Sequence, residues 1–161
     1  MNYSNWTKFN SMFKGCSNLI ELGTIDCSSA TMLSNMFANC TKLPYNPLVN
    51  VTNSLTSLDY LFSECNSLLT LGDISNWNVS GVTDFTSIFS GCNQLTTIDI
   101  SNWDMSNATR MNAAFSGCGY LTELKLPYNI GKSDMVYTFN NCSSLAVIPS
   151  INTEYTTTFS A

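Results

Sequence analysis

The sequence predicts an α/β repeat fold: a leucine-rich-repeat-like solenoid of about six coils, each a short strand plus a short helix, with a parallel sheet on one side. Three observations predict it. The motif Phe-x-x-Cys occurs six times, an apolar stripe of helical spacing precedes each cysteine, and a brief apolar–polar alternation follows most copies. A unit of about 25 residues cannot bury its apolar face alone, so the copies must stack into one continuous core.

The repeat register is set by the phenylalanine and cysteine of each copy. Subtracting successive cysteine numbers gives intervals of 24, 25, 27, 26 and 24 residues, the variation expected when loops tolerate small insertions. The longest interval contains one extra residue at Gly72. We predict that the structural repeat ladder is formed by Phe13, Cys16, Phe37, Cys40, Phe62, Cys65, Phe89, Cys92, Phe115, Cys118, Phe139, Cys142, Trp77 and Trp103.

The first half of each copy is predicted to be a helix of about two turns. Phe85, Ile88, Phe89 and Cys92 stand at i, i+3, i+4 and i+7, which is one face of a helix. Thr83 before this stripe suits an N-cap. Gly15, Gly91 and Gly117, one residue before a cysteine, suit a helix that must stop there.

The second half of each copy is predicted to be a brief strand with one face inward. Leu95, Ile98 and Ile100 are apolar while the residues between the last two positions are polar, an alternation of period two. Residues 121–126 keep this pattern. The Tyr45-Asn46-Pro47 region breaks it, so a regular strand is not expected there. Stacked coils would align the strands in one parallel sheet.

The string LxxIDISNWDMSNATxMxxxFSGC, residues 95–118, resembles the BspA-like leucine-rich repeat of bacterial and protist surface proteins. The preceding copy, with Ser-Asn-Trp at residues 75–77, is nearly as similar, and the resemblance spans essentially the whole chain. It implies a protein displayed outside the cell or on its surface that binds other macromolecules. Repeat scaffolds serve many ends, so the resemblance implies no particular ligand.

The whole chain, residues 1–161, is expected to be a single solenoid domain. Residues 153–161 reproduce the start of a seventh copy and stop before its cysteine would come. Solenoids need polar caps at both ends, and neither end supplies an obvious one. We therefore expect this domain to be a fragment of a longer repeat array.

The composition excludes some classes of partner. The chain is 44% hydrophobic and 11% charged, which suits one folded core. With six Lys and Arg residues and a net charge of −5, it lacks the basic face that nucleic-acid phosphates require. It contains no apolar run of around 20 residues. We expect no nucleic-acid partner and no membrane insertion within this chain, with any export signal and anchor outside it.

Seven cysteines leave two interpretations open, a disulfide framework suited to an extracellular protein or a column of buried thiols. Six of them share one repeat position, and neighbouring helix ends seldom bring Cα atoms within about 7 Å with aligned Cβ vectors. This favours buried thiols that serve as small apolar residues. Cys27 lies outside the register, and a packed thiol is the favoured interpretation there too.

The residues offer little catalytic or metal chemistry. The chain has no His and no CxxC pair, which disfavours zinc sites and the common nucleophilic triads. Its eleven acidic residues form no dyad that the repeat points to. We predict that the protein is not an enzyme and needs no cofactor.

Trp77 and Trp103 share a repeat position, 26 residues apart. They could stack on sugars at the surface, or they could be packing elements whose indole N–H is bonded to backbone. Periodic aromatic residues mark cores more often than sites, which favours packing. The sequons at Asn50 and Asn107 arise from the repeat itself and add little.

Repeats keep their inward positions for packing and vary the outward ones, so the exposed side of the strand ladder is the predicted recognition surface. The predicted ligand-binding residues there are Glu21, Thr24, Tyr45, Thr70, Thr97, Asp99, Glu123 and Lys125. Such a mixed polar surface suits recognition of a host or cell-surface protein or glycan. The alternative is a structural spacer, in a surface protein or a phage tail fibre, that presents another domain and binds nothing itself.

Overall fold

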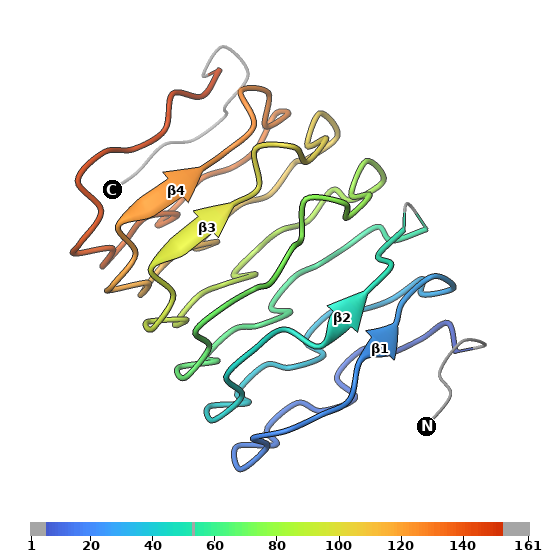
Figure 1. Ribbon diagram of the computed structural model, residues 1–161. Coiled ribbons are helices and arrows are strands. Elements are labelled where there is room, and N and C mark those ends of the chain that lie inside the picture. The colour runs from blue at the N-terminus through green and yellow to red at the C-terminus, as the bar shows by residue number, and fades with distance from the viewer. Residues whose placement is uncertain (1–5, 53, 153–161) are drawn as a thin grey trace.

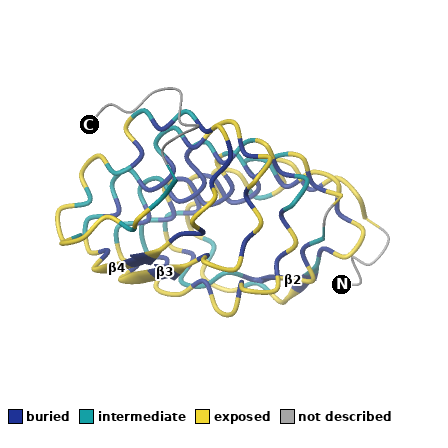
Figure 2. Cartoon of the chain, turned by 90° about the horizontal axis from the view of Figure 1, so that it is seen from above, coloured by how far each residue is buried: buried dark blue, intermediate teal, exposed yellow. Residues whose placement is uncertain are grey.

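The chain winds into a stack of successive coils that run side by side from the N-terminal to the C-terminal end (Figure 1). This computed structural model describes residues 6–52 and 54–152. Buried residues lie inside the coils and exposed residues at their rims (Figure 2). The predicted seventh copy at residues 153–161 lies outside the described residues.

Four short strands lie on one side of the stack. Strand β1 (Ile25–Asp26) pairs in parallel with β2 (Leu48–Val49), and β3 (Thr97–Asp99) pairs in parallel with β4 (Glu123–Lys125). They form two separate two-stranded sheets rather than one continuous sheet. In the irregular second copy, β2 begins directly after Pro47, because the proline lies outside the paired residues.

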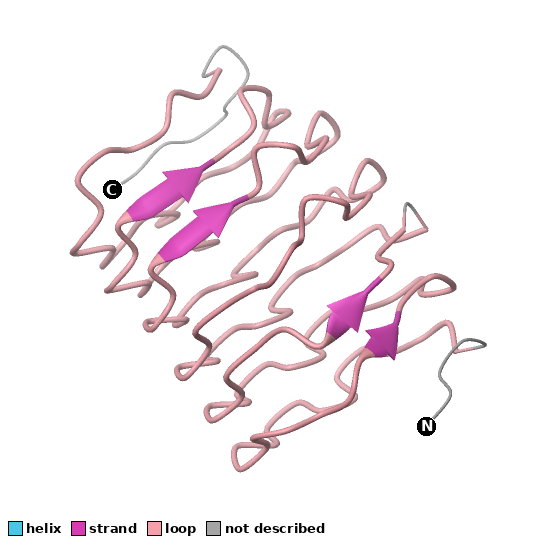
Figure 3. Ribbon diagram, in the orientation of Figure 1, coloured by secondary structure: helices cyan, strands magenta, loops and turns pink. Residues whose placement is uncertain are grey.

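The helices predicted for the first half of each copy are wrong, because the described residues contain no helix (Figure 3). The structure is therefore not an α/β, leucine-rich-repeat-like solenoid with a helix in each coil. Overlapping four-residue turns replace each helix, and two of them follow one another along the apolar stripe. In the fourth copy the N–H of Ile88 donates to Phe85 O at 3.2 Å, and the N–H of Cys92 donates to Phe89 O at 3.1 Å.

The apolar stripe fits both structures, which explains the error. Two consecutive turns place their first and fourth residues inward, at i, i+3, i+4 and i+7, which is also the helical pattern. The backbone partners differ. Alternate N–H groups donate to the next coil, as from Phe89 to Ala114 O at 2.9 Å and from Gly91 to Ser116 O at 2.7 Å. Pairing between coils therefore replaces the i to i−4 bonds of a helix.

The predicted helix stop and helix cap also have different roles. Gly91 has φ of +74°, the left-handed conformation required at the third residue of the second turn. The glycine therefore forms the turn and ends no helix. The Thr83 hydroxyl donates to Thr56 O of the preceding coil, and the Thr109 hydroxyl donates in turn to Thr83 O at 3.1 Å. These hydroxyls join coils instead of capping helices.

The core contains a column of stacked phenylalanine rings. From Phe13 to Phe139, successive rings of the six copies lie 5.5–6.1 Å apart between centroids. The inner rings, such as Phe89, are fully buried, while Phe13 and Phe139 at the two ends are half-buried. Such pairs stabilise beyond their buried area, so the column ties every coil to the next.

A second column is formed by the cysteines. The Cys92 thiol donates to Phe62 O at 3.1 Å, and the Cys118 thiol donates to Phe89 O at 3.2 Å, each reaching the preceding coil. All seven cysteines are free thiols in the structure. Burial is the main cause that raises the thiol pKa of Cys40 to about 11. Burial, with a smaller effect of the Asp26 charge, raises the thiol pKa of Cys27 to about 12. These thiols stay protonated near neutral pH and can act as donors.

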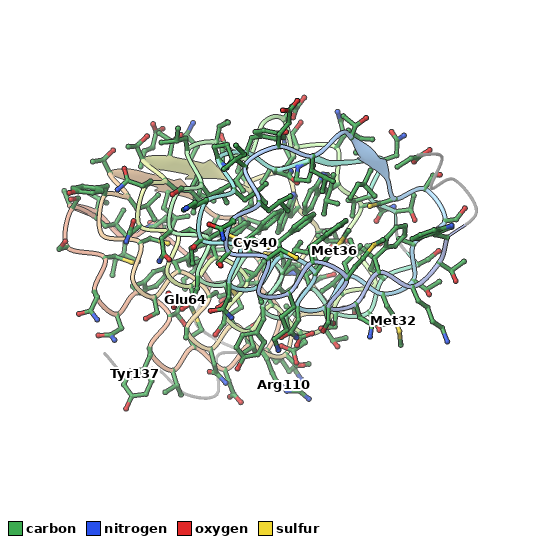
Figure 4. The ribbon with its side chains drawn as sticks, turned by 90° about the horizontal axis from the view of Figure 1, so that it is seen from below. Met32, Met36, Cys40, Glu64, Arg110 and Tyr137 are labelled. Carbon is green, nitrogen blue, oxygen red and sulfur yellow. The ribbon has the colours of Figure 1, made fainter. Side chains whose placement is uncertain are left out.

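The side of each coil opposite the strands carries the paired turns. Viewed along this side, Met36 and Cys40 lie within the coil, whereas Met32, Arg110 and Tyr137 project outward (Figure 4). Arg110 pairs with the Asp84 carboxylate of the preceding coil at 2.5 Å. We call this side the turn face and the opposite side, formed by residues 21–26, 45–50, 70–75, 97–101 and 123–126, the strand face.

Candidate functional site

The predicted ligand-binding residues lie on the strand face, but the structure divides them into separate groups. Glu21 and Thr24 are exposed on the first coil. Thr70, Thr97 and Asp99 come together at one hollow between the third and fourth coils. Glu123 and Lys125 belong to β4, beside that hollow, where Lys125 contacts Asp99 of β3. Of these groups, the one formed by Thr70, Thr97 and Asp99 lines a space that a ligand could enter.

Tyr45 has a structural role. Its hydroxyl donates to Leu22 O at 2.8 Å and accepts from the Leu22 N–H at 2.9 Å. This two-way contact joins the first two coils where β1 and β2 have not yet begun. Because both interactions are already made within the chain, the Tyr45 hydroxyl is not a free group for a ligand.

The hollow arises where the strand ladder is interrupted. Strand β3 pairs with β4 only, and Thr70 of the third coil pairs with Tyr45 of the second. Among the described residues, no backbone–backbone hydrogen bond joins residues 69–74 to residues 95–101. Gly72, at φ of +63°, is the extra residue of the longest repeat interval and turns the chain away from the strand path.

The hollow has a volume of about 260 Å³ and is lined mainly by polar groups. Its polar lining consists of Thr70, Gly72, Asp73, Ser75, Thr97, Asp99 and Asn102. Within the described residues, the edge of β3 that faces it has no strand partner, so the backbone adds donors and acceptors to those of the side chains. The site therefore offers hydrogen bonding in both directions.

Asp73 and Asp99 give the hollow its charge. Asp73 Oδ1 accepts from the Ser75 hydroxyl at 2.6 Å and from the Ser75 N–H at 3.0 Å, and these bonds lower the Asp73 pKa. Asp99 Oδ1 accepts the matching bonds from Ser101, which lower its pKa first, and Lys125 adds to the effect. Both side chains are therefore carboxylates at neutral pH.

The two carboxylates differ in what their second oxygen, Oδ2, contacts. Asp99 Oδ2 lies 3.2 Å from Lys125 Nζ, and Lys125 lies equally close to Glu123 Oε1. Hydrogen bonds to Asp99 and Glu123 raise the Lys125 pKa, so this lysine is committed to its acidic neighbours. Within the described part of the chain, no basic side chain pairs with Asp73. Among the described residues, Asp73 Oδ2 thus has neither a hydrogen-bond donor nor a cation beside it.

A second hollow, of about 250 Å³, lies on the other side of Asp73. It is lined by residues of the second and third coils, among them Asn50, Asn76 and the edge of Trp77. Asp73 lines both spaces, so the third coil forms a ridge between two hollows.

The sequence reasoning missed Asp73, Asn76 and Asn102, because they stand outside the outward strand positions that it considered. The 27-residue interval around Gly72 was the signal that could have pointed to them. Irregularity in one copy marks the place where the ladder opens.

Trp77 and Trp103 are buried, so neither presents its ring to solvent. Their rings stack at 5.8 Å between centroids, and the Trp103 Nε1–H donates to Ile74 O at 2.9 Å. This bond holds the fourth coil against the third immediately beside the hollow. The buried tryptophan rings therefore hold together the two coils that line the hollow.

Two further observations concern metals and membranes. Over residues 6–52 and 54–152, no group of three or more His, Cys, Asp or Glu side chains is placed to hold a metal ion. In the same residues, no helix has the length and apolar character needed to cross a bilayer.

Comparison with known proteins relates the chain to a described family. A family model described as "Mycoplasma protein of unknown function, DUF285" matches residues 7–128 and again residues 49–152. The two overlapping matches together cover most of the chain, as expected when a chain built from repeats aligns in two registers. Neither a curated protein nor a solved structure matches the chain significantly.

Proposed function

The chain belongs to the DUF285 family, and on that premise we propose that it is a non-enzymatic extracellular recognition module that binds a protein or glycan through its strand face. The resemblance of residues 95–118 to BspA-like surface repeats supports an address outside the cell or on its surface. The observation that carries the proposal is the hollow of about 260 Å³ on this face, with its unpaired strand edge and mixed polar lining.

The chemistry of the hollow favours binding over catalysis. Its carboxylates have lowered pKa values and so are poor general acids or bases near neutral pH. The buried thiols have raised pKa values and are therefore weak nucleophiles. What the site provides is a fixed set of hydrogen-bonding groups on a rigid stack, which suits recognition without covalent chemistry.

A steric block of the hollow tests this proposal. Thr97→Arg places a long side chain at the exposed edge of β3, whereas Asn140→Arg places the same side chain on the exposed turn face. We expect wild type and Asn140→Arg to bind alike in a panel of host cells, matrix proteins and glycans, and Thr97→Arg to lose at least tenfold in affinity. Equal binding by all three proteins would show that the strand face is not the recognition surface.

The alternative function is a structural spacer. The unbroken column of rings from Phe13 to Phe139 favours it, because continuous packing makes a stiff rod. A spacer would bind nothing in the same panel, whereas a longer chain carrying a further domain would bind through that domain.

A further inference from the structure

We infer that the hollow beside Asp73 is a subsite for one uncharged sugar residue of a glycan. This inference rests on the proposed function, since it names the class of ligand that the strand face recognises. Three observations carry it: the contacts that hold the two coils together, the hollow's combination of donors and acceptors beside an apolar side chain, and its negative charge.

The contacts between the third and fourth coils exclude a peptide that would add a strand beside β3. Below the hollow the third and fourth coils are held together, with the Phe62 N–H donating to Ile88 O at 2.9 Å and the Trp77 and Trp103 rings stacked at 5.8 Å. A strand inserted beside β3 would need about 4.8 Å on each of its sides. The coils cannot separate that far without breaking these contacts, so the ligand must be compact and enter from outside.

The polar groups match the hydroxyls of a sugar. The Thr70 hydroxyl accepts from the Gly72 N–H at 3.0 Å and keeps its own proton for a ligand acceptor. Asn102 adds an amide with both a donor and an acceptor, and Asp73 Oδ2 adds a charged acceptor. A sugar hydroxyl both donates and accepts, so a ring with several hydroxyls can use this lining in both directions.

The apolar part of the lining suits the C–H face of a sugar ring. Leu69 lines the same hollow and is 62% exposed, whereas the repeat leucine Leu68 beside it is buried. Contact with a ring would remove part of this apolar surface from water, which is favourable.

The charge selects among sugars. Asp73 and Asp99 are both carboxylates, and Lys125, the nearby cation, is already held by Asp99 and Glu123. A sialic or uronic acid would place a third carboxylate beside them without a free partner, which is unfavourable. The second hollow, across Asp73, offers the amides of Asn50 and Asn76 to a neighbouring residue of the same glycan.

A glycan array tests the inference with wild type and two matched variants. Asp73→Asn keeps the oxygen that accepts from Ser75 but replaces the charged Oδ2. Asp104→Asn makes the same change in an equivalent exposed turn, where Asp104 accepts from Ser106, away from the hollow. We expect wild type and Asp104→Asn to retain neutral glycans and Asp73→Asn to lose about tenfold or more, with acidic glycans unbound.

Three results would overturn the inference: retention of acidic glycans only, equal binding of neutral glycans by Asp73→Asn and wild type, or no retained glycan at all. The Thr97→Arg variant separates these failures from failure of the proposed function. If no glycan binds but Thr97→Arg still loses binding to a host protein, the strand face is a protein-binding surface and only the sugar subsite is refuted. If Thr97→Arg also changes nothing in any panel, both proposals fail.

Discussion

Replacing Phe89 by alanine tests whether the ring column holds the stack together. Phe89 is fully buried, and its ring stacks on both Phe62 and Phe115 at 6.1 Å. Truncating such a ring to alanine leaves a cavity and costs roughly 3 to 5 kcal/mol, and the loss of ring pairs worth about 0.5 to 1.5 kcal/mol each moves the cost upward within this range. Because the stacking contacts to both neighbours are lost, we expect the free energy of unfolding to fall by about 5 kcal/mol, near the upper end of this range.

Cys92→Ala is the matched comparison in the neighbouring column. The variant removes one sulfur and its bond to Phe62 O at 3.1 Å, but Phe62 O still accepts from the Cys65 N–H at 3.1 Å. No backbone acceptor is left unpaired, so we expect a loss of about 1 to 2 kcal/mol. Phe139→Ala at the half-buried end of the column, with its stacking contact to Phe115 at 5.9 Å, should lose about 2 kcal/mol.

The assay is equilibrium urea unfolding followed by tryptophan fluorescence, with one slope fitted to all four proteins. The expected order of free-energy losses is Phe89→Ala, then Phe139→Ala, with Cys92→Ala equal to or below the latter. Equal losses for Phe89→Ala and Cys92→Ala would refute the assignment of the ring as the main anchor. Equal losses for the two phenylalanine variants would refute the column, since among the described residues Phe89 stacks on two rings and Phe139 on one.

Two further predictions concern backbone strain and pH. Gly131→Ala should lose about 3 kcal/mol or more in free energy of unfolding, because φ is +66° and a Cβ would lie 2.3 Å from Ala108 O. Gly72→Ala, with open space around its Cβ, should lose only about 1 to 2 kcal/mol. Equal melting temperatures for the two variants would contradict this. At alkaline pH, the folded state holds thiol protons that the unfolded state releases from about pH 9, with folded pKa values of about 11 for Cys40 and about 12 for Cys27. The free energy of unfolding should therefore be constant below pH 9 and fall as pH rises above it. Urea titrations from pH 8 to 10.5 should show a weaker fall in Cys27→Ala than in wild type. An identical fall in both proteins would contradict the assignment of this pH dependence to the buried Cys27 thiol.

The sequence was sufficient to predict the stacking and its register but not the local backbone. Six copies of Phe-x-x-Cys at nearly constant intervals require that equivalent residues meet, and the rings and thiols do form columns. The helix prediction failed because a stripe such as that from Phe85 to Cys92 is shared by a two-turn helix and by two successive turns. Only the competition between bonds inside a coil and bonds to the next coil decides between them, and that competition depends on the stack as a whole.

The candidate site was only partly predictable for a related reason. Alternation along the strands placed Thr70, Thr97 and Asp99 outward, and these three do line the hollow. Their convergence, and the part played by Asp73, depend on where the third coil leaves the ladder at Gly72. A pattern common to all copies cannot describe a feature that exists because one copy departs from it.

The core and the strand face of the coil therefore constrain the sequence differently. Between the third and fourth coils the inner columns are intact, since Phe62 and Phe89 stack at 6.1 Å and the Cys92 thiol still reaches Phe62 O. On the strand face the same two coils share no backbone hydrogen bond across the described residues 69–74 and 95–101. An extra residue is tolerated there because the core does not depend on it, and the intact columns hold the resulting hollow in a fixed shape. A stack of this kind can acquire a hollow that suits a ligand by inserting one residue on its strand face, while the rings and thiols preserve the register.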